Sequence, residues 1–265
     1  TGKTFTGLGA ATWLLKNNKR LAVIIVCPYQ HLVEQWVKDI ERFGFRPVIA
    51  FSSSPQKKWK ERLKDEVIDF NLEIEDTFCL VTTNAPYTSK YVQEQIGKIE
   101  GDILIVVDEA HNFGAMRLSR YLRDDIKYRL ALSATLERHG DEEGTQALYS
   151  YFGNKCIEYD LKRAIDEDKL TKYYYHPIIV SLSDDELEKY RELSAKISKA
   201  CKFNEDGRAE LSEAAKTLLI QRSRIVAGAI EKIAVLKELM KDYVNDNQIL
   251  VYCGATKPYN PALDE

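Results

Sequence analysis

The stretch DILIVVDEAH, residues 102–111, decides the fold of this chain. Residues 103–107 are apolar without a break. A short apolar run that does not alternate with polar residues is typical of a strand buried on both faces, as in a parallel sheet covered by helices. Two carboxylates, Asp108 and Glu109, follow the run directly. Because ligands bind at the carboxyl ends of the strands in open α/β sheets, the stretch predicts a buried parallel strand with a ligand site at its end.

Similar apolar runs recur along the chain and alternate with helical segments. The other predicted strands are Leu21–Cys27, Phe78–Thr82 and Leu130–Leu132, with Val48–Phe51 as a weaker candidate. Amphipathic patterns between the runs predict helices over Thr4–Lys16, His31–Phe43, Gln56–Phe70 and Lys90–Ile99. Strands and helices at this spacing give right-handed crossovers. The sequence therefore predicts a three-layer α/β domain with a parallel sheet.

The composition changes after about Gly153, and the remaining third of the chain is mostly helical in pattern. We expect a helix and an extended connector over residues 161–175, then further elements: an extended run over 178–182, a helix from the acidic cap at 184–186, helices over 209–227 and 230–244 joined near Gly228, and a buried strand over 249–253. One buried strand after several helices is not a complete sheet. We therefore predict a first domain over residues 1–165 and the incomplete start of a second α/β domain over residues 166–265.

Composition and charge narrow the class of protein. The chain has 265 residues, which is room for one or two domains, and its 45% apolar and 30% charged residues are ordinary for a globular protein. No apolar run approaches the roughly 20 residues of a membrane span, so we expect no membrane partner. The net charge of −3 gives no strongly basic surface. A local nucleic-acid groove needs no net positive charge, so this observation excludes little.

The five cysteines are scattered and form no C-x-x-C pair: Cys27, Cys79, Cys156, Cys201 and Cys253. Three of them lie in apolar, strand-like runs, where cysteine behaves as a small hydrophobic residue. We expect reduced thiols without a metal site, in a reducing compartment such as the cytoplasm.

The first four residues, Thr1-Gly2-Lys3-Thr4, match the end of the phosphate-binding pattern G-x-x-x-x-G-K-[ST]. In such a loop the lysine reaches the β- and γ-phosphates, the threonine hydroxyl binds Mg²⁺, and the glycine lets the backbone approach the ligand. The first glycine of the pattern is missing. We therefore expect the chain to begin inside the loop and to be a fragment.

The loop and the acidic pair support one another. One carboxylate of Asp108 and Glu109 can hold Mg²⁺ through water, and its neighbour can orient or deprotonate an attacking water. Taken alone, each motif has a plain structural alternative: a chance GKT at a helix start, and a solvated acidic pair at a strand end. Their order and separation favour nucleotide hydrolysis, because several strand-helix units lie between them.

These motifs resemble those of superfamily 2 helicases and translocases. GKT at 2–4, DEAH at 108–111 and SAT at 133–135 are similar to motifs I, II and III of that family, and residues 26–36 resemble its motif Ia. The segment 132–153 (LSATLERHGDEEGTQALYSYFG) is closest to the DNA-directed branch. That branch includes repair helicases of the xeroderma-pigmentosum B type and restriction-type translocases. The resemblance implies a P-loop RecA-like domain with a parallel sheet, followed by the incomplete start of a second RecA-like domain.

The resemblance also implies roles for particular residues. Gly2, Lys3 and Thr4 would bind ATP and Mg²⁺, Asp108 would hold Mg²⁺, and Glu109 would be the catalytic base. The predicted coupling residues between nucleotide and nucleic acid are His111, Ser133 and Thr135. The predicted contacts with the nucleic-acid backbone are Pro28, Gln30 and Thr83.

The implied function is an ATP-dependent DNA helicase or double-strand DNA translocase. Three alternatives stay open: an RNA helicase, the motor subunit of a restriction system, and a nucleotide-dependent switch without motor activity. Motifs V and VI, which the family places in its second domain, are not present in the sequence. Motif VI supplies an arginine that stabilises the transferred phosphoryl group, so we expect this chain alone to be nearly inactive as an ATPase.

Overall fold

The computed structural model describes residues 2–203 and 209–252. They form two compact units that divide between Lys172 and Tyr173, and each unit is described by itself. The predicted boundary at residues 165 and 166 falls near the end of helix α8 (Leu161–Asp166), which belongs to the first unit.

The first unit is built on one parallel sheet of five strands. The strands are β1 (Leu21–Cys27), β2 (Val48–Ala50), β3 (Thr77–Thr83), β4 (Ile103–Asp108) and β5 (Tyr128–Leu132). Their order in the sheet is β2-β3-β1-β4-β5. Cys27 of β1 pairs with Thr83 of β3, and Val26 pairs with Val107 of β4. The carboxyl ends of these three central strands therefore meet at one edge.

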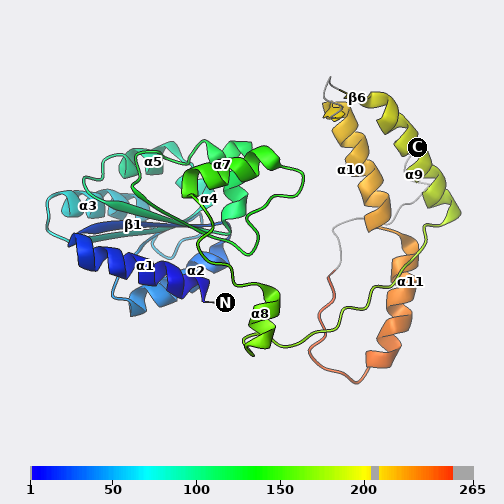
Figure 1. The fold of residues 1–265 in the computed structure, drawn as a ribbon, viewed down its shortest axis with the longest axis horizontal. Helices are drawn as coiled ribbons and strands as arrows, with labels where there is room; N and C mark the ends of the chain where they lie inside the picture. The colour runs from blue at the N-terminus through cyan, green and yellow to red at the C-terminus, as the bar shows by residue number, and fades with distance from the viewer. Residues whose placement is uncertain (1, 204–208, 253–265) are drawn as a thin grey trace. The chain divides into compact units, whose positions relative to one another are not determined.

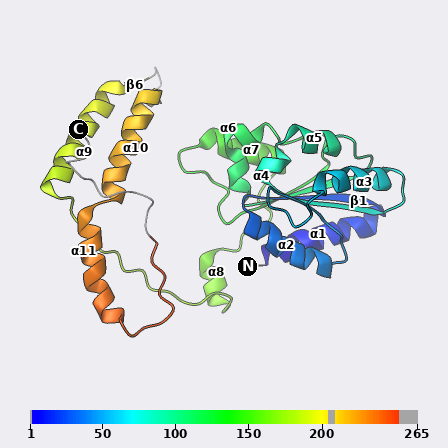
Figure 2. The same ribbon diagram turned by 180° about the vertical axis from the view of Figure 1, so that it is seen from behind.

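Helices cover both faces of this sheet, as both views of the ribbon show (Figures 1 and 2). One face carries α1 (Lys3–Asn18) and α2 (Gln30–Arg42). The other carries α3 (Trp59–Asn71), α4 (Asn84–Tyr87), α5 (Lys90–Ile96) and α7 (Glu142–Phe152). Two short helices, η1 (Ala110–Gly114) and α6 (Met116–Ser119), follow β4. The predicted three-layer α/β fold is confirmed.

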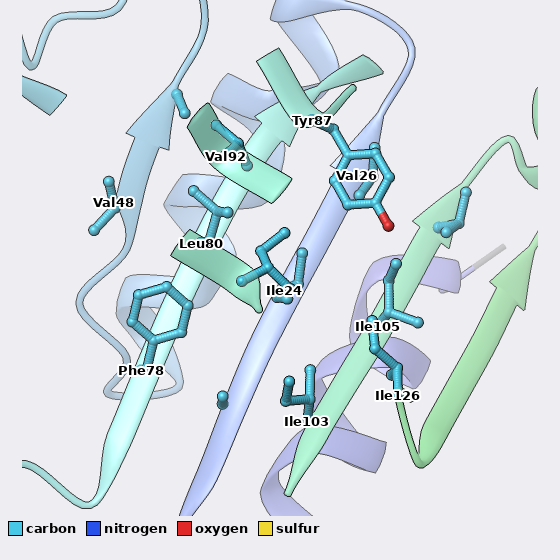
Figure 3. Close-up of a cluster of buried hydrophobic side chains, with 14 of the residues drawn as sticks. Ile24, Val26, Val48, Phe78, Leu80, Tyr87, Val92, Ile103, Ile105 and Ile126 are labelled. Atoms are coloured by element: carbon cyan, nitrogen blue, oxygen red, sulfur yellow. The ribbon is translucent and has the colours of Figure 1, made fainter. Parts of the chain in front are cut away.

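The core lies in two layers, one on each face of the sheet. Ile24 and Val26 of β1 pack towards the α3 side together with Leu80 of β3 (Figure 3). Ile25 and Cys27 pack on the opposite face, against α1 and α2. Every residue of β1 is buried, which explains why its sequence does not alternate between apolar and polar.

The second unit is helical in its described residues, with one small hairpin. Its helices are α9 (Asp184–Ala200), α10 (Glu213–Ala227), α11 (Ile230–Leu239) and η2 (Met240–Tyr243), and its antiparallel strands are β6 (Cys201–Phe203) and β7 (Ala209–Leu211). The fully buried Glu186 links two of the helices. Its carboxylate accepts hydrogen bonds from the backbone N–H groups of Ser183 (2.9 Å) and Ile230 (3.0 Å), so the acidic cap of α9 also holds the start of α11.

Two sequence predictions in this unit are wrong. The helix predicted over 209–227 begins only at Glu213, because residues 209–211 pair in the hairpin instead. The buried strand predicted over 249–253 does not form in residues 249–252, and Leu250 and Tyr252 are 73% and 89% exposed. A strand needs a pairing partner, and the described part of this unit offers only the short hairpin. Cys253 lies outside the described residues. That residues 166–265 begin a second RecA-like domain stays a prediction.

None of the described helices is both long enough and apolar enough to cross a membrane.

Candidate functional site

The first feature of the site is the N-terminus of α1. The helix begins at Lys3, and Gly2 precedes it with φ 74° and ψ 12°, a left-handed conformation that glycine adopts without steric cost. Among the residues that the structure describes, no side chain caps this helix end. Its backbone N–H groups and its dipole therefore make it suited to an anion, as the phosphate-loop pattern predicts.

Lys3 lies next to the acidic pair, although 106 residues separate them in sequence. The Nζ atom of Lys3 is 2.9 Å from Oε1 of Glu109, and the two side chains are 31% and 29% exposed. The sheet order explains this meeting, because α1 leads into the central strand β1 and β4 is the neighbour of β1 in the sheet.

Asp108 is held by hydrogen bonds to both of its carboxylate oxygens. The residue is 9% exposed and ends β4. The indole Nε1 of Trp36, on α2, donates to Oδ2 at 2.9 Å, and the backbone N–H of Glu109 donates to Oδ1 at 3.0 Å. Each oxygen keeps a lone pair for a further partner. Asp108 is thus a fixed carboxylate at the ligand edge of the sheet.

Sequence reasoning missed the role of Trp36, because a tryptophan in an amphipathic helix is usually a packing residue. The sequence did contain an indication of a close contact, because a glycine in the interior of α1 costs about 1 kcal/mol relative to alanine. A Cβ atom built on Gly7 would lie 2.9 Å from the ring of Trp36. Gly9 is the counter-example, since a Cβ atom there would meet nothing within 4 Å. Sequence alone does not distinguish the two glycines.

Glu109 has an unusual backbone conformation, with φ 50° and ψ 50°. A non-glycine residue in the left-handed region costs of order 1–3 kcal/mol and persists only where the surroundings enforce it. Here Asn112 fixes the turn, because both its backbone N–H (3.1 Å) and its side-chain amide (2.9 Å) donate to the carbonyl of Glu109. The turn brings the Glu109 side chain to Lys3.

The three predicted coupling residues form a chain that starts at Glu109. Nδ1 of His111 lies 3.4 Å from Oε2 of Glu109 and 3.2 Å from Oγ of Ser133. The Ser133 hydroxyl in turn donates to the backbone carbonyl of Thr135 at 2.7 Å. The chain thus joins the end of β4 to the loop after β5. Thr135 takes part through its backbone, and its side chain is exposed.

Arg138 fastens the loop after β5 to the DEAH segment, and the site prediction did not include it. Its guanidinium donates to the backbone carbonyl of His111 and, at 2.7 Å, to Oδ2 of Asp141. Arg138 and the backbone N–H of Gly144 lower the pKa of the Asp141 carboxyl by hydrogen bonding to it. The helix α7 packs closely here, because a Cβ atom on Gly144 would lie 2.5 Å from the carbonyl oxygen of Gly114.

These residues fit a magnesium-bound nucleoside triphosphate. An uncapped helix end and the Lys3 ammonium suit phosphates, and Asp108 offers a fixed oxygen ligand. Thr4 follows Lys3 and is partly buried, and its hydroxyl makes no hydrogen bond to another described residue. Among the described residues, no three His, Cys, Asp or Glu side chains gather in a metal-binding group. One or two carboxylates are enough where phosphates supply the other ligands.

Pro28, Gln30 and Thr83 do not join this cluster. They line a separate groove of about 570 Å³ at the carboxyl ends of β1 and β3, which we call the aromatic groove. Its other lining residues are Tyr29, Ser52, Trp59, Lys60, Asn84, Ala85, Pro86, Ser89 and Tyr91. The residues predicted to touch nucleic acid thus share one surface, next to the strand that carries Asp108.

The buried cysteines are not nucleophiles. Burial raises the pKa of the Cys79 thiol to about 12, and the carboxylate of Glu66 adds to this effect. Burial likewise raises the pKa of Cys27, with a further contribution from Asp108. A thiol that stays protonated at neutral pH is a poor nucleophile and a poor metal ligand, so both residues serve packing.

The family model described as type III restriction enzyme, res subunit, matches residues 1–138, which is more than half of the chain. The match contains Lys3, Asp108, Glu109, His111, Ser133 and Thr135. No curated protein matches the chain.

Several solved structures are similar to this chain. The ATP-dependent type ISP restriction-modification enzyme LlaBIII bound to DNA has a TM-score of 0.50 at 18% identity, over 65% of this chain and 14% of its own. A nuclease-deletion mutant of the type ISP enzyme LlaGI with a DNA substrate mimic gives 0.48 at 18%, over 75% and 20%. The Pyrococcus furiosus Hef helicase domain gives 0.45 at 20%, over 74% and 41%. At such identities the likeness to LlaBIII concerns the fold alone, and this chain spans less than half of each.

Proposed function

We propose that this chain, which belongs to the family of the type III restriction enzyme res subunit, is the ATP-binding part of a motor that moves on DNA. One observation carries the proposal: the phosphate-loop lysine and the acidic pair share a single site, with Lys3 Nζ 2.9 Å from Glu109 Oε1. The chain spans a minor part of the solved structures that it resembles. Movement on DNA is therefore proposed for the full-length protein.

The chemistry follows from the fixed and the free groups of the site. Magnesium-bound ATP supplies the phosphoryl group and a neutralising charge. Lys3 would exchange the Glu109 carboxylate for a phosphate when nucleotide binds, and Asp108 would offer Mg²⁺ a lone pair that its two hydrogen bonds leave free. Thr4 would offer its hydroxyl to Mg²⁺ as a further ligand. Glu109, released from Lys3, orients water and accepts its proton.

The coupling to nucleic acid would run through the chain from Glu109 to His111 and Ser133. Nδ1 of His111 lies 3.4 Å from Oε2 of Glu109, so a movement of the Glu109 side chain would also move His111. Ser133 transmits that change to the loop after β5 through its contact with the Thr135 carbonyl. In this proposal Pro28, Gln30 and Thr83 of the aromatic groove touch the sugar-phosphate backbone of the nucleic acid.

The substrate of the motor is DNA in our proposal, because the family is one of restriction enzymes and the segment 132–153 resembles the DNA-directed branch. LlaBIII, by its description, is an ATP-dependent restriction-modification enzyme bound to DNA. The restriction motor is thus the specific form that we favour. We place it in the cytoplasm, as reduced cysteines suggest, with residues 166–265 as the connector and incomplete start of a second RecA-like domain.

A substitution at Glu109 tests the assignment of the base. In the full-length protein, Glu109→Gln should lower the ATPase rate by about 100-fold or more while ATP still binds, because loss of a general base removes roughly 10²–10⁴ in rate. Glu143→Gln, an exposed glutamate on α7, is the matched control and should leave the rate unchanged. Hydrolysis at a near wild-type rate in Glu109→Gln would show that another group is the base.

The choice of nucleic acid has its own test. We expect duplex DNA to stimulate the ATPase activity of the full-length protein more than structured RNA does. Stronger stimulation by RNA would indicate an RNA helicase. Stimulation by neither would indicate a nucleotide-dependent switch.

A further inference from the structure

The aromatic groove presents three rings from three different elements. Tyr29 precedes α2, Trp59 begins α3, and Tyr91 lies in α5. Tyr29 is 60% exposed and stacks on His31, with ring centroids 5.6 Å apart and an interplanar angle of 9°. Backbone contacts with DNA would not need these rings. Exposed aromatic faces at the ligand edge of a sheet are suited to planar ligands, since bases stack on them with little sequence preference.

Lys60 gives the groove a positive charge without a counter-ion. Its Nζ atom lies 5.7 Å from the Trp59 ring centroid and 5.8 Å from that of Tyr91. Within the described residues no carboxylate is at ion-pair distance from Lys60. The nearby Lys58, in contrast, pairs with Glu61 at 3.2 Å. The Tyr91 hydroxyl donates to the Lys60 carbonyl at 2.6 Å, which ties the start of α3 to α5. The rings and the ammonium group of the groove therefore suit a ligand that has both an aromatic ring and a negative charge.

Polar groups complete the lining. The Gln30 side chain is held between two hydroxyls, because it donates to Ser52 (3.0 Å) and accepts from Ser53 (2.9 Å). The side-chain amide of Asn84 makes no hydrogen bond to any described residue, so it offers both a donor and an acceptor to a ligand. The groove combines apolar rings, one cation and a free amide. These are the groups that recognise a nucleotide.

We propose that the aromatic groove binds one unstacked nucleotide of a single nucleic-acid strand, with the base against Tyr29 and Trp59 and a phosphate at Lys60. The inference rests on the proposed function and deepens it, because it adds base contacts to the backbone contacts expected from Pro28, Gln30 and Thr83. A strand gripped by a base does not slip along its backbone. The groove would therefore hold the strand between successive steps of the motor.

Binding of an oligothymidylate to the full-length protein tests this proposal. Tyr29→Leu should weaken binding about tenfold, because stacking of a base is worth on the order of a tenfold to a hundredfold in affinity. Trp13→Leu is the control, since Trp13 is 65% exposed on α1 and does not line the groove. Trp59 and Tyr91 pack partly against the core, so the exposed Tyr29 is the safer position for a substitution.

An abasic strand of the same length separates base contacts from backbone contacts. Tyr29→Leu should leave the affinity for the abasic strand unchanged. An equal loss on both strands would overturn the proposal, because it would show a backbone contact only. Lys60→Gln should reduce the slope of log affinity against log salt by about 0.7 on either strand, as for one phosphate contact, whereas Lys38→Gln on α2 should not.

Two further measurements complete the test. Trp13→Phe keeps two tryptophans of this chain, the buried Trp36 and Trp59 of the groove. In this variant the oligothymidylate should quench the tryptophan fluorescence, and thymidine monophosphate should do so far more weakly. If the oligothymidylate and thymidine monophosphate bound with equal affinity in this assay, the groove would be a site for free nucleotides, which would contradict the proposal. The ATPase rate of the wild-type protein with and without DNA separates the two proposals. If DNA stimulates that rate while Tyr29→Leu binds the oligothymidylate as tightly as the wild type does, the groove proposal fails and the motor proposal stands.

Discussion

Two regions at the same edge of one sheet differ in how their polar groups are used. At the end of β4 most functional groups already have partners: Lys3 pairs with Glu109, Asp108 accepts two hydrogen bonds, and His111 lies between Glu109 and Ser133. In the aromatic groove at the ends of β1 and β3, Lys60 and Asn84 have no polar side-chain partner among the described residues. Groups that perform chemistry need fixed positions, whereas groups that grip a passing strand need only to be accessible.

The largest expected difference between the regions comes from Lys3→Ala. We expect an ATPase rate at least about 100-fold lower in the full-length protein, as for loss of a group that stabilises transition-state charge. Oligothymidylate binding in the absence of nucleotide should stay within twofold of the wild type. If strand binding fell in parallel with hydrolysis, the two regions would not be separate sites.

The next effect comes from Trp36→Phe, which keeps a buried ring and removes the hydrogen bond to Asp108. Because outer-shell partners typically change metal affinity or activity by about 10- to 100-fold, we expect ATPase activity to require correspondingly more Mg²⁺. A titration of the rate with Mg²⁺ measures this. A lower thermal stability with an unchanged Mg²⁺ requirement would show that Trp36 serves packing alone.

The glycines of α1 offer a matched pair. Gly7→Ala should destabilise the first unit by about 1–3 kcal/mol, since overpacking forces the buried Trp36 ring to move. Gly9→Ala should be neutral or stabilising by up to about 1 kcal/mol, because alanine has the higher helix propensity and a Cβ atom there meets nothing. Urea denaturation measures both. Equal effects would contradict the close contact between Gly7 and Trp36.

The smallest effect concerns the thiols and pH. Burial raises the pKa of Cys79 to about 12. The folded protein therefore keeps the thiol proton at pH values above 9.0, the ordinary pKa of a cysteine, where the unfolded chain loses it. The stability from this thiol is therefore full below pH 9.0 and falls as the pH rises towards 12. At pH 8, alkylation followed by peptide mass spectrometry should label the exposed Cys156 and leave Cys27 and Cys79 unmodified. Equal labelling of the three would contradict the burial.

The sequence predicted the first unit well, because buried parallel strands can be recognised in a sequence as unbroken apolar runs. Leu21–Cys27 matches β1 at both ends, and the helices α1, α2 and α5 lie where periodicity placed them. The second unit was harder to predict. The apolar run at 249–252 has the composition of a strand, but composition does not supply a pairing partner.

By itself, the sequence determined the strands of the first unit and which polar residues follow them, since Asp108 and Glu109 stand directly after an unbroken apolar run. Only the tertiary structure decided how Asp108 is held, because the Trp36 hydrogen bond joins residues 72 positions apart and depends on the crossing of α1 over α2 at Gly7. The same holds for the aromatic groove. Tyr29, Trp59 and Tyr91 come from three separate segments, and no local pattern records that packing brings their rings to one surface.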